Sequence, residues 1–144
     1  MVRAFFDAGA LGAWWQATCS ITLPRALGPY VIEWAIGEER DEVLGRLGGV
    51  LRGTVMQIDA AHGFFLADVY WLPPDGPPIG PMALEVSCTG KSPTGVESIM
   101  EEFETTLRVV QTGYDKSVRW QRYYEVFGTS WIRALTALKG LLET

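Results

Sequence analysis

The clearest pattern in the chain is a stripe of apolar residues near its C-terminus. Between residues 117 and 144, apolar side chains recur at steps of three and four, the spacing that places them on one face of a helix. The stripe consists of Trp120, Tyr124, Phe127, Trp131, Leu135, Leu138 and Leu142. Its first half is aromatic and its second half aliphatic. A helix of this length spans roughly 40 Å, so the pattern predicts a long amphipathic helix lying along a broad partner.

Most of the remaining chain alternates between apolar and polar residues, as is typical of strands with one buried face. Strands are predicted over 17–23, 30–36, 54–59, 64–72, 82–89 and 99–112. The inward positions are predicted to be Cys19, Ile21, Leu23, Tyr30, Ile32, Trp34, Ile36, Met56, Ile58, Phe65, Ala67, Val69, Trp71, Met82, Leu84, Val86, Cys88, Leu107, Val109 and Gln111. One or two short helices are predicted within 3–16, with Asp7 as a cap. The proline-rich run 73–81 is predicted to lie outside the sheet.

The order of these elements predicts an α+β fold: short helices, about six antiparallel strands joined by hairpins, and then one long helix. A sheet with one apolar face and a helix with one apolar stripe bury each other. The 144 residues are interpreted as a single domain, 1–144, which is long enough to form an ordinary core.

Composition and charge narrow the functional classes. The chain is 48% hydrophobic and carries a net charge of -5 without a basic stripe, which argues against nucleic-acid binding. No apolar run reaches the roughly 18 residues of a membrane span, and the N-terminus lacks a signal-peptide pattern. Cys19 and Cys88 match no metal or redox spacing, and both fall on predicted buried faces. Buried, reduced cysteines are expected in a cytoplasmic protein.

Four segments together resemble a known superfamily. They are VRAFFDAGALGAWW, GTVMQIDAAHGFFLADVYW, TLRVVQTGY and RYYEVFGTSWIRALTALKGLLE. Their order and spacing are similar to those of the SRPBCC (START-like) superfamily, in its AHSA-like branch named after the activator of heat-shock-protein-90 ATPase. The resemblance implies a helix-grip fold, in which a curved antiparallel sheet wraps around a long C-terminal helix and leaves a cavity between them. Members include ligand carriers, cyclase-like and hydrolase-like proteins, and co-chaperones.

Two features depart from that family. Members usually begin with a strand before the first helix, whereas Met1 stands about where that strand would already have ended. Three explanations are open: the translation start lies upstream of Met1, the chain has been trimmed, or the protein lacks this strand. A missing strand would leave an open edge, for example along 105–112, and we hypothesise a homodimer through such an edge. The second departure is the long segment 90–104, which is interpreted as a solvated acidic loop.

Few residues offer catalytic chemistry. His62, the only histidine, lies in the predicted turn 60–63 and is expected on the surface, so a catalytic triad or a zinc site is not expected. Asp68 is expected to face solvent. The glycines between residues 45 and 53 match no phosphate-binding motif, and no cofactor or metal is expected. Gln111 shares a face with apolar residues, so its amide must either bond to backbone or orient a ligand.

The sequence therefore favours a binding module for a small hydrophobic or aromatic molecule over an enzyme. The expected ligand-binding residues are Trp15, Trp34, Trp71, Gln111, Tyr124, Phe127 and Trp131, with space beside them at Gly128. Tyr123 is expected to add a hydrogen-bond donor at the rim. A cyclase-like or hydrolase-like enzyme stays open as an alternative, but it would need an inward acid or base. A co-chaperone-like interaction domain is the third alternative.

Overall fold

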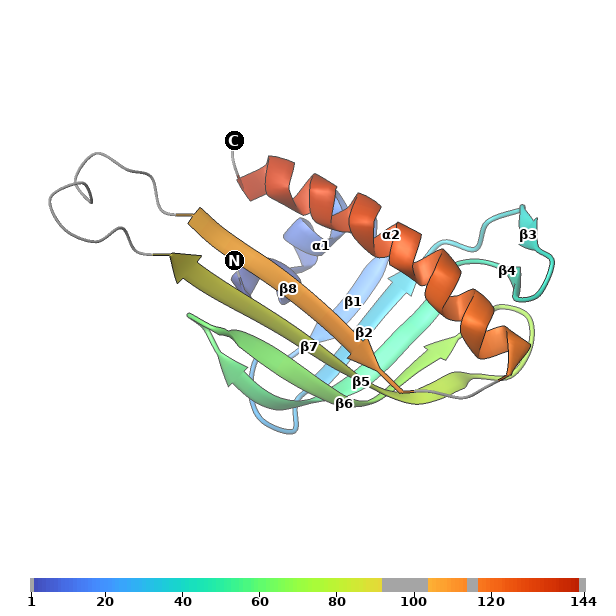
Figure 1. Cartoon of the computed structure of the whole chain (residues 1–144), viewed down its shortest axis with the longest axis horizontal. Helices are drawn as coiled ribbons and strands as arrows, with labels where there is room; N and C mark the ends of the chain where they lie inside the picture. Colours follow the sequence, from blue (N-terminus) through green and yellow to red (C-terminus); the bar gives the residue numbers. More distant parts are fainter. Residues whose placement is uncertain (1, 92–103, 114–116, 143–144) are drawn as a thin grey trace, which may run out of the picture.

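The computed structural model of the chain describes residues 2–91, 104–113 and 117–142 (Figure 1). The helical elements are the 3-10 helix η1 (Val2–Phe5), α1 (Ala8–Trp14) and α2 (Val118–Leu142). The strands are β1 (Cys19–Thr22), β2 (Pro29–Trp34), β3 (Arg40–Asp41), β4 (Gly45–Arg46), β5 (Gly49–Asp59), β6 (Gly63–Leu72), β7 (Ile79–Lys91) and β8 (Glu104–Thr112). The predicted α+β order of short helices, strands and a long final helix is confirmed.

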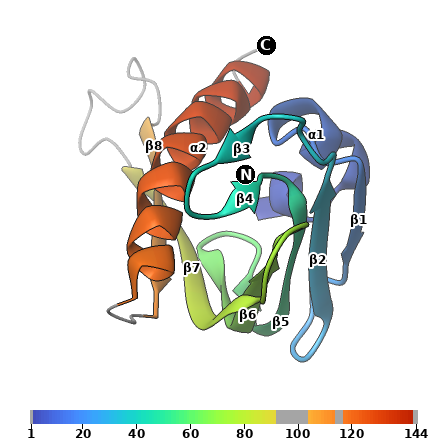
Figure 2. The ribbon, with the colours of Figure 1, turned by 90° about the vertical axis from the view of Figure 1, so that its right-hand side faces the viewer.

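Six strands form one open antiparallel sheet in the order β1-β2-β5-β6-β7-β8, so β1 and β8 are its edges. The sheet curves, and α2 lies along its open side with α1 next to it (Figure 2). This arrangement is consistent with the helix-grip architecture expected from the sequence. Strands β3 and β4 pair separately in the connection between β2 and β5. No helix in the described ranges is long and apolar enough to cross a membrane.

Backbone carbonyls of the N-terminal segment accept hydrogen bonds both from α1 and from the sheet. The Trp14 indole donates to Ala4 over 2.9 Å, and the Tyr30 hydroxyl donates to Phe5 over 2.8 Å. Asp7 caps α1 as predicted, because its carboxylate accepts from the Ala10 amide at 2.9 Å. These contacts hold α1 at one end of the sheet, beside α2.

The inward face of β1 is the opposite of the predicted one. Cys19, Ile21 and Leu23 are exposed, with Ile21 at 59% exposure, so the prediction that Cys19 is buried was wrong. The other face carries Ser20 and Thr22, and the Thr22 hydroxyl donates to the Phe6 carbonyl over 2.9 Å. The inward face of this strand is polar because it packs against the N-terminal segment, where the Phe6 carbonyl accepts a hydrogen bond from Thr22.

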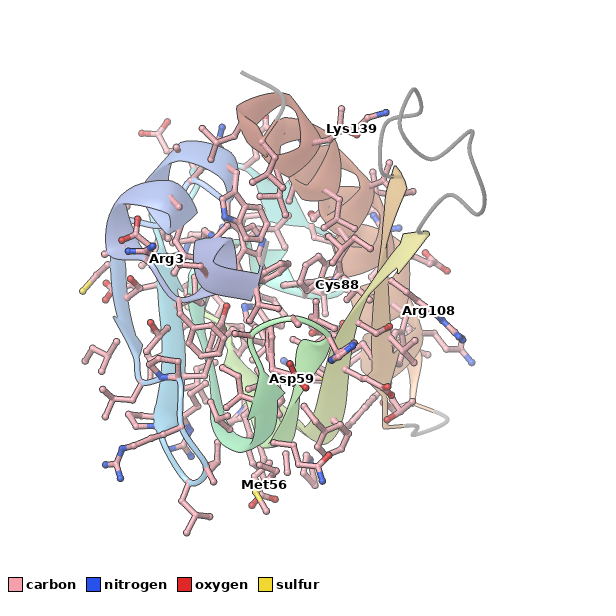
Figure 3. The ribbon with its side chains drawn as sticks, turned by 90° about the vertical axis from the view of Figure 1, so that its left-hand side faces the viewer. Arg3, Met56, Asp59, Cys88, Arg108 and Lys139 are labelled. Carbon is pink, nitrogen blue, oxygen red and sulfur yellow. The ribbon has the colours of Figure 1, made fainter. Side chains whose placement is uncertain are left out.

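Irregularities in β5 and β6 reverse part of the faces predicted there, although Ile58 packs against the core as predicted. The register shifts around Gly53, whose added Cβ would lie 2.9 Å from a methyl group of Val69, and again before Gln57. Val55 is therefore buried and Met56 exposed, contrary to the prediction. Figure 3 shows Met56 pointing away from the core, whereas Cys88 of β7 lies within it as predicted.

The shift around Gly53 is caused by an extra residue in β6 at Asp68, which has a φ of 52° and faces solvent as predicted. Before it, Phe64 and Leu66 point inward in place of the predicted Phe65 and Ala67. After it, the predicted inward residues Val69 and Trp71 are confirmed. The extra residue thus restores the predicted face only in the second half of the strand.

The proline-rich run was predicted to stay outside the sheet, and this holds for 73–78 but not for 79–81. Strand β7 begins at Ile79, which pairs with Trp71. Pro81 lies where the ladder shifts between that pair and the Val69–Met82 pair. A proline is tolerated at such an irregular position because its missing amide hydrogen would not enter a regular ladder. Most of the predicted acidic loop, 92–103, lies outside the described residues.

Helix α2 is rotated slightly from its predicted orientation. Its buried residues are Tyr123, Ala134 and Leu138, whereas Leu142 is exposed. Gly128, expected beside a cavity, lies on the exposed side, and an added Cβ would meet no atom within 4 Å. Phe127 and Trp131 are half-buried and pack against the core, as predicted. The centre of the buried face therefore runs through Tyr123 rather than Tyr124.

Candidate functional site

A cavity of about 590 Å³ lies between α2 and the end of the sheet covered by α1. This volume is within the range of about 300–1,000 Å³ that is usual for small-molecule sites. Six of its lining side chains are aromatic: Trp14, Trp15, Trp34, Tyr123, Phe127 and Trp131. Buried residues, including Leu51 and Ala134, form its inner part. Exposed residues form its mouth, among them Gln16, Gly37, Glu38, Glu39, Ser130, Arg133 and Ala137.

Trp15 is the centre of the aromatic wall. Its ring stacks on Trp14 at a centroid distance of 4.9 Å and meets the edge of Trp34 at 5.2 Å. On the other side it packs against Trp131 of α2 at 4.8 Å. The Trp34 indole also donates a hydrogen bond to the Trp15 carbonyl over 3.0 Å. Three predicted site residues from α1, β2 and α2 therefore meet in one wall.

Phe127 lines the cavity and is supported from behind by Trp71. The two rings meet edge to face at 4.9 Å, and Phe127 stacks on Tyr123 at 4.3 Å. Trp71 is fully buried and does not line the cavity, and its indole donates to the Gly48 carbonyl over 2.8 Å. Trp71 was expected as a cavity wall, but the structure places it as packing behind that wall.

A polar pair lies among these apolar residues. The Gln111 amide of β8 donates to the Tyr123 hydroxyl of α2 over 2.6 Å and lies 3.5 Å from the Met82 sulfur. Burial raises the pKa of the Tyr123 hydroxyl, so this group stays protonated. Its O–H can donate and the Gln111 carbonyl can accept a hydrogen bond. Both residues line the cavity, so Gln111 bonds to a side chain where one sequence interpretation expected a bond to backbone.

Tyr124, the remaining predicted site residue, lies outside the cavity. Its hydroxyl donates to the backbone carbonyl of Gly113 and so joins α2 to the end of β8. Five of the seven predicted residues thus line the cavity, while Tyr124 and Trp71 support its walls. Tyr123 takes the inward place expected of Tyr124, and four-residue spacing to Phe127 was the available signal for it.

The charged side chains of the described cavity lining all lie at its mouth. Glu38 and Glu39 come from the connection after β2, and Arg133 comes from α2. All three are exposed, and no other charged side chain belongs to the described lining of the cavity. The sequence analysis missed these rim residues, because nothing in their local pattern indicates that the connection folds toward α2.

Two ion pairs fix that connection. Asp41 accepts from Arg122 of α2 at 2.7 Å and from the amides of Val43 and Leu44, each at 3.0 Å. The Arg122 guanidinium is the main reason that the pKa of Asp41 falls to about 2. Further along, the Arg46 guanidinium makes two hydrogen bonds to the Asp75 carboxylate, at 2.9 and 2.8 Å. These pairs position the β3–β4 turn, which leads directly into the cavity-lining residues 47 and 48.

His62 plays no part in the cavity. It lies in the exposed turn between β5 and β6, as predicted, with its ring 2.9 Å from the Asp59 carboxylate. That contact is the first cause of the lowered pKa of Asp59. In the part of the chain that the structure describes, no three His, Cys, Asp or Glu side chains gather as metal ligands would.

Comparison of the chain with protein-family models, curated proteins and solved structures finds no match. The function is therefore inferred from the residues of the cavity and from the way the fold holds them.

Proposed function

We propose that the protein is a binding module that holds a small, mainly hydrophobic molecule between the sheet and α2. The observation that carries this proposal is a cavity of about 590 Å³ with six aromatic side chains and one internal polar pair. Sites for small molecules are mostly apolar, with a few polar groups that set orientation. The resemblance to the SRPBCC superfamily supports the same function, since many of its members carry ligands in an equivalent position.

The polar pair gives the ligand an orientation. A ligand in the cavity would lie against the aromatic wall of Trp15, Trp34 and Trp131, and Gln111 and Tyr123 belong to the same lining. Burying about 300 Å² of its apolar surface would contribute about 7 kcal/mol before the costs of immobilisation are subtracted. Before those costs, about 7 kcal/mol corresponds to a Kd of several micromolar, and the costs weaken binding further, so a binding experiment must extend into the millimolar range.

An enzyme of the hydrolase or cyclase kind is less well supported. General acid–base catalysis needs a titratable group close to the reacting atoms. In the described lining, the carboxylates stand at the mouth and the innermost ionisable group is Tyr123, whose pKa is raised by burial. For the third alternative, a co-chaperone-like interaction domain, no contact among the described residues gives specific support.

The proposal is tested with the uncharged fluorophore phenylnaphthylamine, whose emission increases in apolar surroundings. Wild-type protein should bind it saturably, and native mass spectrometry of freshly purified protein should reveal any retained ligand as added mass. Ser130→Trp places a large ring at the mouth and should weaken binding at least tenfold. Ile132→Trp is the matched control, because Ile132 is 72% exposed on the same helix and outside the lining. Equal binding by Ser130→Trp and the control would reject this cavity as the site.

We also propose a cytoplasmic location and a homodimeric state for the protein. Cys19 and Cys88 are both free thiols, which supports the reducing cytoplasm. A homodimer through a sheet edge is supported by the position of β8, which pairs with β7 at the end of the sheet order. Light scattering at high protein concentration tests the dimer, and a monomeric mass would reject it.

A further inference from the structure

We propose that the cavity selects hydrophobic organic cations, meaning an amine or quaternary ammonium group on an aromatic or alkyl body. This inference rests on the proposed binding function and names the charge class of its ligand. Three observations carry it: the charges at the mouth, the tryptophans that line the cavity beside them, and the uncharged inner lining.

The mouth carries more negative than positive charge. Glu38 and Glu39 contribute two carboxylates and Arg133 one guanidinium, so the charged lining residues sum to 1 − 2 = −1. The protein as a whole carries -5, which lowers the energy of an approaching cation at long range. The described lining thus carries two carboxylates and one guanidinium, a balance that disfavours an anion.

Half-buried tryptophans line the cavity together with the charged residues of its mouth. The Trp34 N–H is already donated to the Trp15 carbonyl, so this donor is not available to bind an anion. Trp15 is enclosed by Trp14, Trp34 and Trp131, so the half-buried rings of Trp34 and Trp131 are the ones that a cation would contact. Indole is the best aromatic partner for a cation, whose positive charge is attracted to the negative face of the ring.

The interior requires the rest of the ligand to be apolar. Leu51, Phe127 and Ala134 line the inner part, where a charged group would lose its hydration without a counter-ion. A cation held at the mouth keeps part of its water and has Glu38 and Glu39 nearby. The two ends of the cavity therefore select an amphiphilic cation whose apolar end lies inside.

The size of the expected selectivity follows from two modest effects. Cation–π contacts at partly exposed sites and one net unit of negative charge in a largely aqueous environment each contribute a few-fold. Together they predict a preference of roughly fivefold to thirtyfold for a cation over a neutral molecule of the same shape.

The test uses three molecules of one shape and different charge: phenylbutylamine, phenylbutanol and phenylbutyrate. Isothermal titration calorimetry at low salt should rank them amine, alcohol, acid, and added salt should reduce the gap between amine and alcohol. If the alcohol binds as tightly as the amine, or the acid binds tightest, the charge selectivity is wrong while the binding function stands. If none of the three binds and phenylnaphthylamine also fails to bind, the proposed function itself is wrong.

Variants separate the local from the global effect of charge. Glu38→Gln/Glu39→Gln should reduce the preference for the amine over the alcohol to the few-fold that the cation–π contacts supply. Glu33→Gln/Glu42→Gln removes the same charge from exposed positions outside the cavity lining and should keep most of the preference. An equal loss in both double variants would assign the preference to net charge and overturn the proposed role of the mouth.

Discussion

The indole nitrogen of Trp34 lies 3.0 Å from the backbone carbonyl of Trp15, the C-cap residue that follows α1. This hydrogen bond joins the second strand to the N-terminal helix, and the same two rings form the wall of the cavity. The bond therefore couples the stability of the N-terminal segment to the shape of the site.

Removing this hydrogen bond should weaken the attachment of α1 to the sheet while an aromatic ring still lines the cavity. Trp34→Phe keeps an aromatic ring but loses the donor, and we expect the free energy of unfolding to fall by about 1–2 kcal/mol. Amide hydrogen exchange should rise first in α1 and around residue 16. Urea denaturation measures the loss, and an unchanged midpoint would show that the Trp15 carbonyl finds an equivalent partner.

The Gln111–Tyr123 pair should behave as a unit. Tyr123→Phe and Gln111→Leu each leave one polar group of the pair without its partner, so each is expected to cost about 1–3 kcal/mol. The double variant should cost less than the sum, with a coupling of about 0.5–1.5 kcal/mol. A double-mutant cycle by urea denaturation measures this coupling, and strict additivity would argue that the 2.6 Å contact carries little energy.

The ion pair of Asp41 predicts a defined dependence of stability on pH. The pKa of Asp41 is about 2 in the folded protein and 3.8 in its ordinary state, because Arg122 stabilises the carboxylate. Its contribution is therefore fully present above pH 3.8 and is lost as the pH falls toward 2.

Asp41→Asn isolates this effect. The variant should be less stable than wild type at neutral pH, and the difference should shrink as the pH is lowered through the same window. Urea denaturation at several pH values measures the difference. A gap between wild type and variant that stays constant down to pH 2 would contradict the assigned role of Asp41.

Two glycines near the site should respond in opposite directions to alanine. Gly48 has a φ of 96°, and a Cβ there would collide with the Ala35 carbonyl, so Gly48→Ala is expected to cost about 2–5 kcal/mol. Gly128 is exposed in the middle of α2 with open space around it. Gly128→Ala should stabilise the protein by up to about 1 kcal/mol and leave phenylnaphthylamine binding unchanged. Thermal unfolding of both variants measures this, and weaker binding in Gly128→Ala would place that residue nearer the cavity.

The elements that the sequence predicted well are those whose pattern is local and long. Helix α2 repeats its apolar spacing over 25 residues, and β7 alternates from Met82 to Cys88 without interruption. The faces of β5 and β6 were harder to predict. Their bulges depend on contacts across the sheet, such as the approach of Val69 to Gly53, that neither strand encodes alone.

The candidate site shows the same division. Four aromatic residues of the site were predictable, because large apolar side chains on inward faces must pack against other apolar groups. They are Trp15, Trp34, Phe127 and Trp131. Trp71 has the same pattern, yet the Gly48 segment and Phe127 cover it. The charged mouth was not predictable, since Glu38 and Glu39 reach the cavity only because distant ion pairs to Arg122 and Asp75 fold the connection toward α2.

The stacked pair of Trp14 and Trp15, with ring planes 9° apart, has an optical consequence. Four of the six tryptophans of the chain line one cavity, so most of the intrinsic near-ultraviolet signal originates at its wall. A ligand that changes the surroundings of these indoles would change their fluorescence and near-ultraviolet circular dichroism. Ligand binding could therefore be followed through the intrinsic tryptophan signal, without an added label.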